Sequence, residues 1–362
     1  MTRFQFLFSL TILAAGLVAV QTQAAELYGL EPSPVELKSV GPMAFGPDSV
    51  LFVGDPKAAK VYALQLDDKQ KVDAHYNVEQ LDTAIAKACG GKMSIVDMAI
   101  NPSSGNVFVG LTGQGKNLIA KVTSSGDVSL VSMDKIGNAS ATMPNAPEDK
   151  EVRRGRRRSN ARNSSITDLA YTDGKVLVAG LEAGDAPSAI REFDFPFREQ
   201  SEGMSVEIYH AAHGRSEDYA AIQTFVPFNI GGEPSLLAGY TCTPLVKIPV
   251  GKIGDKKQVT GTTVAELGNR NRPLDMIHYK RGDKDFLLMA NSSRGVMRIS
   301  TDGLTENDGL TKPVSGGGTA GQEYTTIDSL KGVVQLSKYD DGHAVVISTG
   351  DNGMVLKTIH LP

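Results

Sequence analysis

Short apolar runs separated by polar turns recur along most of this chain, which predicts β-strands joined by tight connections. Six segments share one order: a short apolar strand, a turn, a second strand rich in Val and Leu, a polar loop and a third strand. They begin at Pro42, Asp97, Asp168, Thr224, Asp275 and Val333. The starts lie about 50–70 residues apart, which leaves room for a fourth strand, such as residues 128–131 and 263–266. The chain is therefore predicted to repeat a four-stranded unit.

Four strands per repeat are typical of β-propeller blades, so the predicted fold class is all-β, a six-bladed β-propeller of four-stranded blades. A seventh, degenerate blade stays open because the segment between the second and third repeats is long. Residues 26–30 are expected to supply the outer strand of the last blade. Residues 78–91, in the connection before the second blade, are expected to form a short helix, since Leu81, Ile85 and Ala88 are apolar at helical spacing.

Residues 1–25 have the pattern of a secretory signal peptide: Arg3, a long apolar run, and small residues at 24–25. The mature protein is then one propeller domain at 26–362, secreted or periplasmic, with no transmembrane segment once the signal is removed. Cys89 and Cys242 would meet an oxidising compartment there. A disulfide bridge between them and two separately buried thiols both stay open.

Composition narrows the function classes. The formal net charge is −4 and the sequence pI is near 5.9, which argues against general nucleic-acid binding. The absence of Trp excludes the Trp-Asp ends of WD40 blades and the tryptophan docking motifs of quinoprotein alcohol dehydrogenases. The sequence also lacks Cys-x-x-Cys-His, His-Glu-x-x-His and Gly-x-Ser-x-Gly, so these haem, zinc and nucleophile motifs are not available.

The strand sequences Gly105-Asn-Val-Phe-Val and Ile119-Ala-Lys-Val resemble those of extracytoplasmic six-bladed propellers of the NHL-repeat, TolB-like and gluconolactonase-like groups. The resemblance spans nearly the whole mature chain, but it concerns blades and no active site. It implies the fold. Membership of the gluconolactonase-like group would further imply a divalent ion at the channel mouth, although the characteristic Glu near the chain start and the Asn–Asp pair are not placed here.

Three carboxylates, Asp97, Asp168 and Asp275, stand at the start of the expected inner strands, near the central channel. Together they could hold Ca²⁺ or another divalent cation, which takes oxygen ligands. The alternative is structural: each carboxylate would accept hydrogen bonds from backbone N–H groups of a neighbouring blade. His210 and His213 could share a metal only with a third ligand, which their spacing does not place.

The loops after the second strands are expected to share one face of the disc, where binding residues concentrate on a rigid scaffold. The alternative for each loop is ordinary turn chemistry. The polar residues that these loops carry as binding candidates are Asp55, Asn117, Asp185, Tyr240, Thr241, Asn291, Arg294, Asp351 and Asn352.

A basic stretch at residues 150–162 lies within an expected insertion at about 143–165. Without this stretch and the signal, the remaining chain has a charge of about −11. The stretch could dock an anionic partner, or it could be a solvated, disordered insertion. Its candidate residues are Arg153, Arg154, Arg156, Arg157 and Arg158.

Two functions follow. The first is a binding or interaction module whose loop face takes a protein, glycan or small-molecule ligand, with no established cofactor. The alternative is a metal-dependent hydrolase of the gluconolactonase-like type, with Asp97, Asp168 and Asp275 beside Asn291 as its candidates.

Overall fold

The structure is a computed structural model that describes residues 28–362, except 155, 199–200 and 252. The expected signal peptide at 1–25 lies outside the described residues. Within the described part of the chain, no helix has the length and apolar character needed to cross a bilayer.

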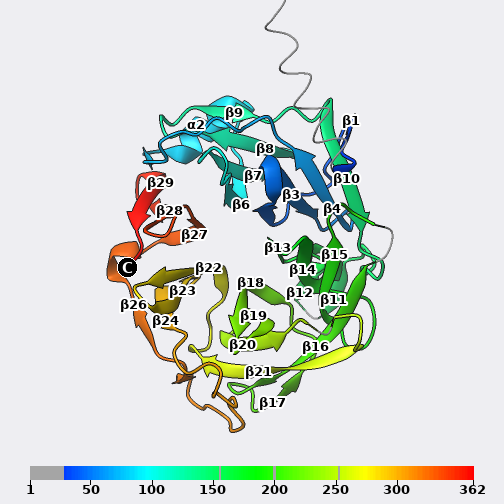
Figure 1. Ribbon diagram of the computed structural model, residues 1–362, viewed down its shortest axis with the longest axis vertical. Coiled ribbons are helices and arrows are strands. Elements are labelled where there is room, and N and C mark those ends of the chain that lie inside the picture. The colour runs from blue at the N-terminus through cyan, green and yellow to red at the C-terminus, as the bar shows by residue number, and fades with distance from the viewer. Residues whose placement is uncertain (1–27, 155, 199–200, 252) are drawn as a thin grey trace, which may run out of the picture.

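The described strands form the sheets of a β-propeller, arranged radially with their first strands towards the centre (Figure 1). Strand pairing is antiparallel except where β16 (Glu202–His210) and β21 (Gln258–Glu266) pair in parallel and join two blades into one sheet. We number the sheets as blades in chain order. Blade 1 contains β2 (Met43–Phe45), β3 (Val50–Asp55), β4 (Lys60–Gln65), β10 (Ile136–Thr142) and β1 (Glu31–Ser33), and blade 2 contains β6 (Ser94–Ile100), β7 (Val107–Gly113), β8 (Lys116–Val122) and β9 (Val128–Leu130). Blade 3 contains β13 (Asp168–Thr172), β14 (Lys175–Leu181), β15 (Ser188–Asp194) and β16 (Glu202–His210), and blade 4 contains β18 (Ile222–Ile230), β19 (Glu233–Tyr240), β20 (Pro244–Pro249) and β21 (Gln258–Glu266).

Blade 5 contains β22 (Pro273–Arg281), β23 (Lys284–Asn291), β24 (Gly295–Ser300) and β26 (Tyr324–Thr326), and blade 6 contains β27 (Val333–Lys338), β28 (His343–Gly350), β29 (Gly353–His360) and β5 (Asn77–Val78). The remaining elements are α2 (Leu81–Cys89), the short helices η1 (Pro47–Ser49), η2 (Ala161–Ser164) and η3 (Asp328–Leu330), and the strands β11 (Val152–Arg154), β12 (Arg157–Ser159), β17 (Arg215–Glu217) and β25 (Ala320–Gly321). All six predicted repeats thus supply the first three strands of a blade.

The turns between the strands follow from local sequence. Asp173 and Gly174 join β13 to β14 with φ values of 49° and 77°. Two consecutive positive φ values are what a two-residue hairpin turn needs, and Asp-Gly provides them at little steric cost. The predicted helix is confirmed as α2, which ends at Gly90, a left-handed residue with φ 72°.

The blades do not follow one another around the ring in chain order. Each of six core clusters is shared by two neighbouring blades: 1 with 2, 2 with 6, 6 with 5, 5 with 4, 4 with 3, and 3 with 1. The inner strands show the same neighbours, since β2 lies between β6 and β13, and β6 lies beside β27. The ring therefore reads 1, 2, 6, 5, 4, 3.

The segment between blades 2 and 3 makes this order possible. After β9 the chain returns along the outside of blade 1 as β10, where Ser140 pairs with Tyr62 of β4, and only then reaches blade 3. The segment between the second and third repeats, for which the sequence leaves a seventh blade open, forms β10 and the β11–β12 hairpin.

The expectation that residues 26–30 close the last blade is wrong. The outer strand of blade 6 is β5, where Val78 pairs with Leu356, because the chain passes blade 6 on its way from blade 1 to blade 2. Leu30 is instead buried in the core between blades 1 and 3, and the strand that follows it, β1, pairs with β10.

Candidate functional site

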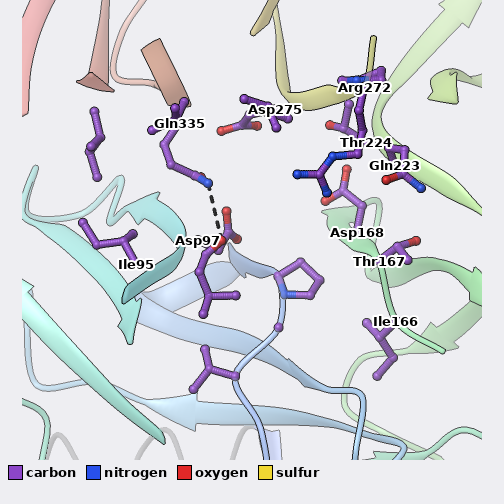
Figure 2. A pocket seen from close by; sticks show the side chains of 18 of the residues that line it. Ile95, Asp97, Ile166, Thr167, Asp168, Gln223, Thr224, Arg272, Asp275 and Gln335 are labelled. Carbon is purple, nitrogen blue, oxygen red and sulfur yellow. Dashed lines mark hydrogen bonds between the residues drawn. The ribbon is translucent and has the colours of Figure 1, made fainter. Parts of the chain in front are cut away.

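A pocket of about 580 Å³ opens at the centre of the ring, where the inner strands begin (Figure 2). Asp97, Asp168 and Asp275 enter it from three different blades. Its wall also carries hydrogen-bonding side chains, and Gln335 donates to the carbonyl of Val96 at 3.4 Å. The other polar residues that line it include Asn163, Thr167, Gln223, Thr224 and Arg272.

Each channel carboxylate accepts a hydrogen bond from the backbone of the next blade. Asp97 accepts from the N–H of Met43, Asp168 from that of Phe225, and Asp275 from that of Leu336, each at 2.6 Å. In chain order the donors look irregular, but around the ring the acid-bearing blades 2, 5 and 3 alternate with the receiving blades 1, 6 and 4. The three Asp residues thus form a threefold set of ties between paired blades.

Burial raises the pKa of all three channel carboxyl groups. The pKa of Asp97 and of Asp168 rises to about 7, although backbone N–H donors work in the opposite direction. The charge of Asp97 raises the pKa of Asp275 further. The set is therefore partly protonated at neutral pH.

The same three carboxylates also line a second pocket, of about 490 Å³, on the other side of the ring. They thus stand between two hollows. Within the described chain, the set of three His, Cys, Asp or Glu side chains whose ligand atoms all lie within 4.8 Å does not include them. This spacing and the ties to backbone N–H groups favour the structural alternative for Asp97, Asp168 and Asp275.

We use the term loop face for the face that carries the connections between second and third strands. A further pocket of about 520 Å³ opens there between blades 1 and 2. Lys38, Lys57 and Lys116 line it and are all exposed. No ion pair joins any of them to a carboxylate in the described part of the chain. We call it the lysine pocket.

Two predicted loop residues line pockets of the loop face. Asn117 lies in the lysine pocket and donates to the carbonyls of Leu37 and Lys38 at 3.1 and 3.0 Å. Arg294 lines a separate pocket of about 720 Å³ and donates to the carbonyl of Asn269 at 3.1 Å. The structure therefore does not bring these two side chains into one site.

Three of the predicted loop residues are buried. Asp55 accepts from the N–H groups of Lys38, Ser39 and Ala58, which is turn chemistry. Tyr240 is 1% exposed and belongs to the core between blades 3 and 4. Asn291 is 6% exposed and donates to the carbonyls of Met289 and Gly295. The remaining four, which line none of the pockets described here, are exposed on the loops: Asp185, Thr241, Asp351 and Asn352.

The basic insertion contains an antiparallel hairpin, β11 with β12, in which Arg153 pairs with Arg158. Arg153, Arg156 and Arg158 are exposed, and Arg158 lies 3.3 Å from Glu151. Arg154 and Arg157 belong to the two strands of the same hairpin. Close by, Arg162 donates to the carbonyl of Lys57 at 3.2 Å, which ties the insertion to the rim of the lysine pocket.

Cys89 and Cys242 are both free, so the bridge between them is not formed. Cys89 is buried in the core between blades 2 and 6, because α2 packs beside β9 and β29 and does not reach across the channel mouth. Cys242 lies in the connection between β19 and β20. Figure 1 shows these two strands on the opposite side of the ring from α2.

The pocket residues Lys38, Lys116, Gln223 and Arg272 were missed from the sequence. Each lies in a connection or at the end of a strand, and the repeat pattern does not set such a residue apart from ordinary turn residues. Lys38 and Lys116 come together because blades 1 and 2 are neighbours in the ring.

No known family of protein sequences matches this chain, and no curated protein matches it. Solved structures with a similar fold include a putative oxidoreductase (glucose dehydrogenase) from Thermus thermophilus, at 13% identity and a TM-score of 0.35, covering 91% of this chain and 100% of that one. The soluble aldose sugar dehydrogenase from Escherichia coli matches at 11% identity and 0.36, covering 92% and 100%. A chain of the mitotic checkpoint complex matches at 10% and 0.39, covering 92% of each chain. At this level no activity carries over.

Proposed function

We propose that this protein is a secreted or periplasmic binding module that takes an anionic, hydroxyl-rich ligand on its loop face. The lysine pocket carries the proposal, because it gathers three exposed ammonium groups without a described carboxylate partner. The compartment rests on the signal-peptide pattern of residues 1–25.

The chemistry of the lysine pocket suits an acidic group of a ligand. Ammonium groups form charge-assisted hydrogen bonds with carboxylates, sulfates and phosphates, which are stronger than neutral ones. Ser39, Thr112, Asn117 and Asn163 line the same pocket and add neutral polar groups. The chain as a whole carries a net negative charge, so the attraction for an anion is local to this surface.

The lysine pocket and the central pocket adjoin, since Val40, Pro56 and Asn163 line both. The central pocket offers carboxamide and hydroxyl groups, Arg272, and three partly ionised carboxyl groups whose remaining charge disfavours a second anion. A ligand that spans both would therefore place its anionic group among the lysines and a neutral, hydrogen-bonding portion in the central pocket. An acidic oligosaccharide has this chemistry.

The hydrolase alternative gains no support from the central pocket. Its candidate carboxylates bind backbone N–H groups, and Asn291 is engaged with backbone carbonyls.

Isothermal titration calorimetry tests the proposal with an oligogalacturonide, a sulfated disaccharide, inorganic phosphate and a neutral oligosaccharide as probes. We expect an anionic saccharide to bind, with an affinity that falls as salt rises. Replacing Lys38, Lys57 and Lys116 together by Ala should weaken binding by at least about tenfold, since one charge-assisted hydrogen bond is worth about 1.5–3 kcal/mol.

The matched control replaces Lys69, Lys71 and Lys331 by Ala. These lysines are also exposed and line none of the pockets described above. The proposal fails if no anionic probe binds, or if the two triple variants bind equally well.

A further inference from the structure

A cluster of two histidines and a glutamate lies beside the pocket of Arg294, whose lining includes Ala212. Strand β16 ends at His210, the chain turns, and β17 returns antiparallel to it. The N–H groups of His213 and Gly214 both donate to the carbonyl of His210, which closes this turn. Ile208 pairs with Glu217, so His210 and Glu217 are diagonal neighbours on one face of the two strands. Figure 1 shows β16, β17 and β21 together at one edge of the ring.

The two imidazoles converge on one carboxylate. Nδ1 of His210 lies 2.9 Å from Oε2 of Glu217, and Nδ1 of His213 lies 2.7 Å from Oε1. The imidazole ring centroids are 3.8 Å apart. One ligand atom from each of the three residues lies within 4.8 Å of the others, which is the spacing of ligands around a single ion.

We propose that His210, His213 and Glu217 form a binding site for a divalent transition metal ion of the Zn²⁺ type. Imidazole nitrogens favour Zn²⁺ and its neighbours in the first transition row over Ca²⁺ and Mg²⁺, which take oxygen ligands. Two His and one Glu supply three of the four ligands of a tetrahedral ion and leave one position open. A neutral imidazole binds the ion through the nitrogen that carries no proton, so binding releases a proton to solvent only from an imidazolium.

Two buried polar atoms near the turn point to the same conclusion. His210 is 2% exposed, and its Nε2 has no hydrogen-bond partner in the described part of the chain. Glu266, at the end of β21, is 1% exposed: one of its oxygens accepts from the N–H of Ala212, between the two histidines, and the other has no partner among the described residues. Unpaired buried polar atoms are costly, and functional sites are a common place for them. Glu266 thus brings a second carboxylate against the turn that carries the ligands.

The charge on Glu217 is balanced without a metal by groups that can move aside. The two oxygens of Glu217 contact His210, His213 and Arg215 at 2.7–3.1 Å. Arg215 lies 3.1 Å from Oε1 and its side chain is 63% exposed, so it can turn into solvent when an ion takes its place.

Metal titration of the whole protein, prepared without a polyhistidine tag and freed of metals with a chelator, tests this site. We expect one equivalent of Zn²⁺ to bind by calorimetry, and one equivalent of Co²⁺ to give the visible absorption of a tetrahedral ion. Excess Ca²⁺ should not displace either ion.

His213→Ala is the decisive variant, because this side chain is 43% exposed and its removal leaves no core cavity. It should lower Zn²⁺ affinity by at least tenfold, and Glu217→Gln should do the same if it folds. His75→Ala is the matched control, since that imidazole is 73% exposed and far from the cluster in the fold. Arg215→Ala should keep or tighten binding. Failure of the wild type to bind one equivalent, or equal binding by His213→Ala, would overturn the proposal.

Discussion

Asp168→Asn tests whether the channel carboxylates are held partly protonated by the fold. Asp168 accepts from the N–H of Phe225 on one oxygen and of Leu169 on the other, and burial raises its pKa from 3.8 to about 7. Between pH 3.8 and about 7, Asp168 is ionised in the unfolded chain but keeps its proton in the folded chain. The stability linked to Asp168 is therefore fully present below pH 3.8 and is lost as the pH rises to about 7.

The size of the effect follows from the shift. One pKa unit is worth about 1.4 kcal/mol, so the shift of roughly three units sets an upper bound of about 4 kcal/mol. Only about two of these units lie between pH 5 and 8.5, which limits the loss in that window to about 2.7 kcal/mol. Asp168 borders a water-accessible pocket, which screens its charge, so we expect the wild type to lose about 1–2.5 kcal/mol between pH 5 and 8.5. Asn has the shape and charge of the protonated acid, but its amide nitrogen cannot accept from the N–H group that the second oxygen of Asp168 binds. Asp168→Asn should therefore be less stable than the wild type near pH 5, by about 1–3 kcal/mol for the unpaired N–H, and this deficit should shrink by pH 8.5 as the wild type loses stability.

Urea denaturation at several pH values between 5 and 8.5 measures this slope. Asp185→Asn, on an exposed loop, is the control and should follow the wild-type profile. A variant at Asp168 that keeps the wild-type slope, or that loses stability more at pH 8.5 than at pH 5, would show that the carboxylate is an ordinary ionised acceptor. The reasoning on burial would then be wrong.

Two further predictions concern packing between elements. Asp68 is 7% exposed, accepts from Asn101, Ser104 and Asn106, and lies 3.4 Å from Nζ of Lys121. Asp68→Ala should lower the free energy of unfolding by about 3–5 kcal/mol in urea because it leaves a charge and several donors unpaired, whereas Asp67→Ala, on the exposed neighbour, should change it little. A Cβ on Gly180 would overlap the carbonyl oxygen of Ser165, so Gly180→Ala should cost about 1–3 kcal/mol. Gly251→Ala, with its nearest neighbour atom at 3.9 Å, should leave the melting temperature almost unchanged; equal melting of the two alanine variants would contradict the close approach.

The strands of each blade could be predicted from sequence because their signals are local. Alternation of apolar residues, together with turns such as Asp173-Gly174, identifies the first three strands of all six repeats. The order of the blades could not be predicted. It depends on the pairing of β10 with β4 and of β5 with β29, and these short strands gain their stability from partners far away in the chain.

The candidate sites, too, could be predicted only in the part that depends on local sequence. The recurrence of Asp97, Asp168 and Asp275 was visible in the sequence, and so was the alternative that each one binds a neighbouring backbone N–H. The sequence did not show why only blades 2, 3 and 5 carry such an Asp. These blades alternate with the three receiving blades only in the observed ring order. His210 and His213 were also visible, but the role of Glu217 depends on the return of β17.

Ring order also brings Asn163 and the basic hairpin to the proposed ligand surface. In a ring that followed chain order, blade 1 would lie between blades 2 and 6, and residues 160–167, which lead into blade 3, would be one blade away. Here blade 1 lies between blades 2 and 3, so Lys38 and Lys57 of blade 1, Lys116 of blade 2 and Asn163 before blade 3 line one pocket. The chain that brings Asn163 there has just passed along blade 1 as β10 and carries the basic hairpin with it. Blades 1 and 2 are neighbours in either order, so the departure from chain order adds Asn163 and the basic hairpin to a lysine pocket that these two blades already form.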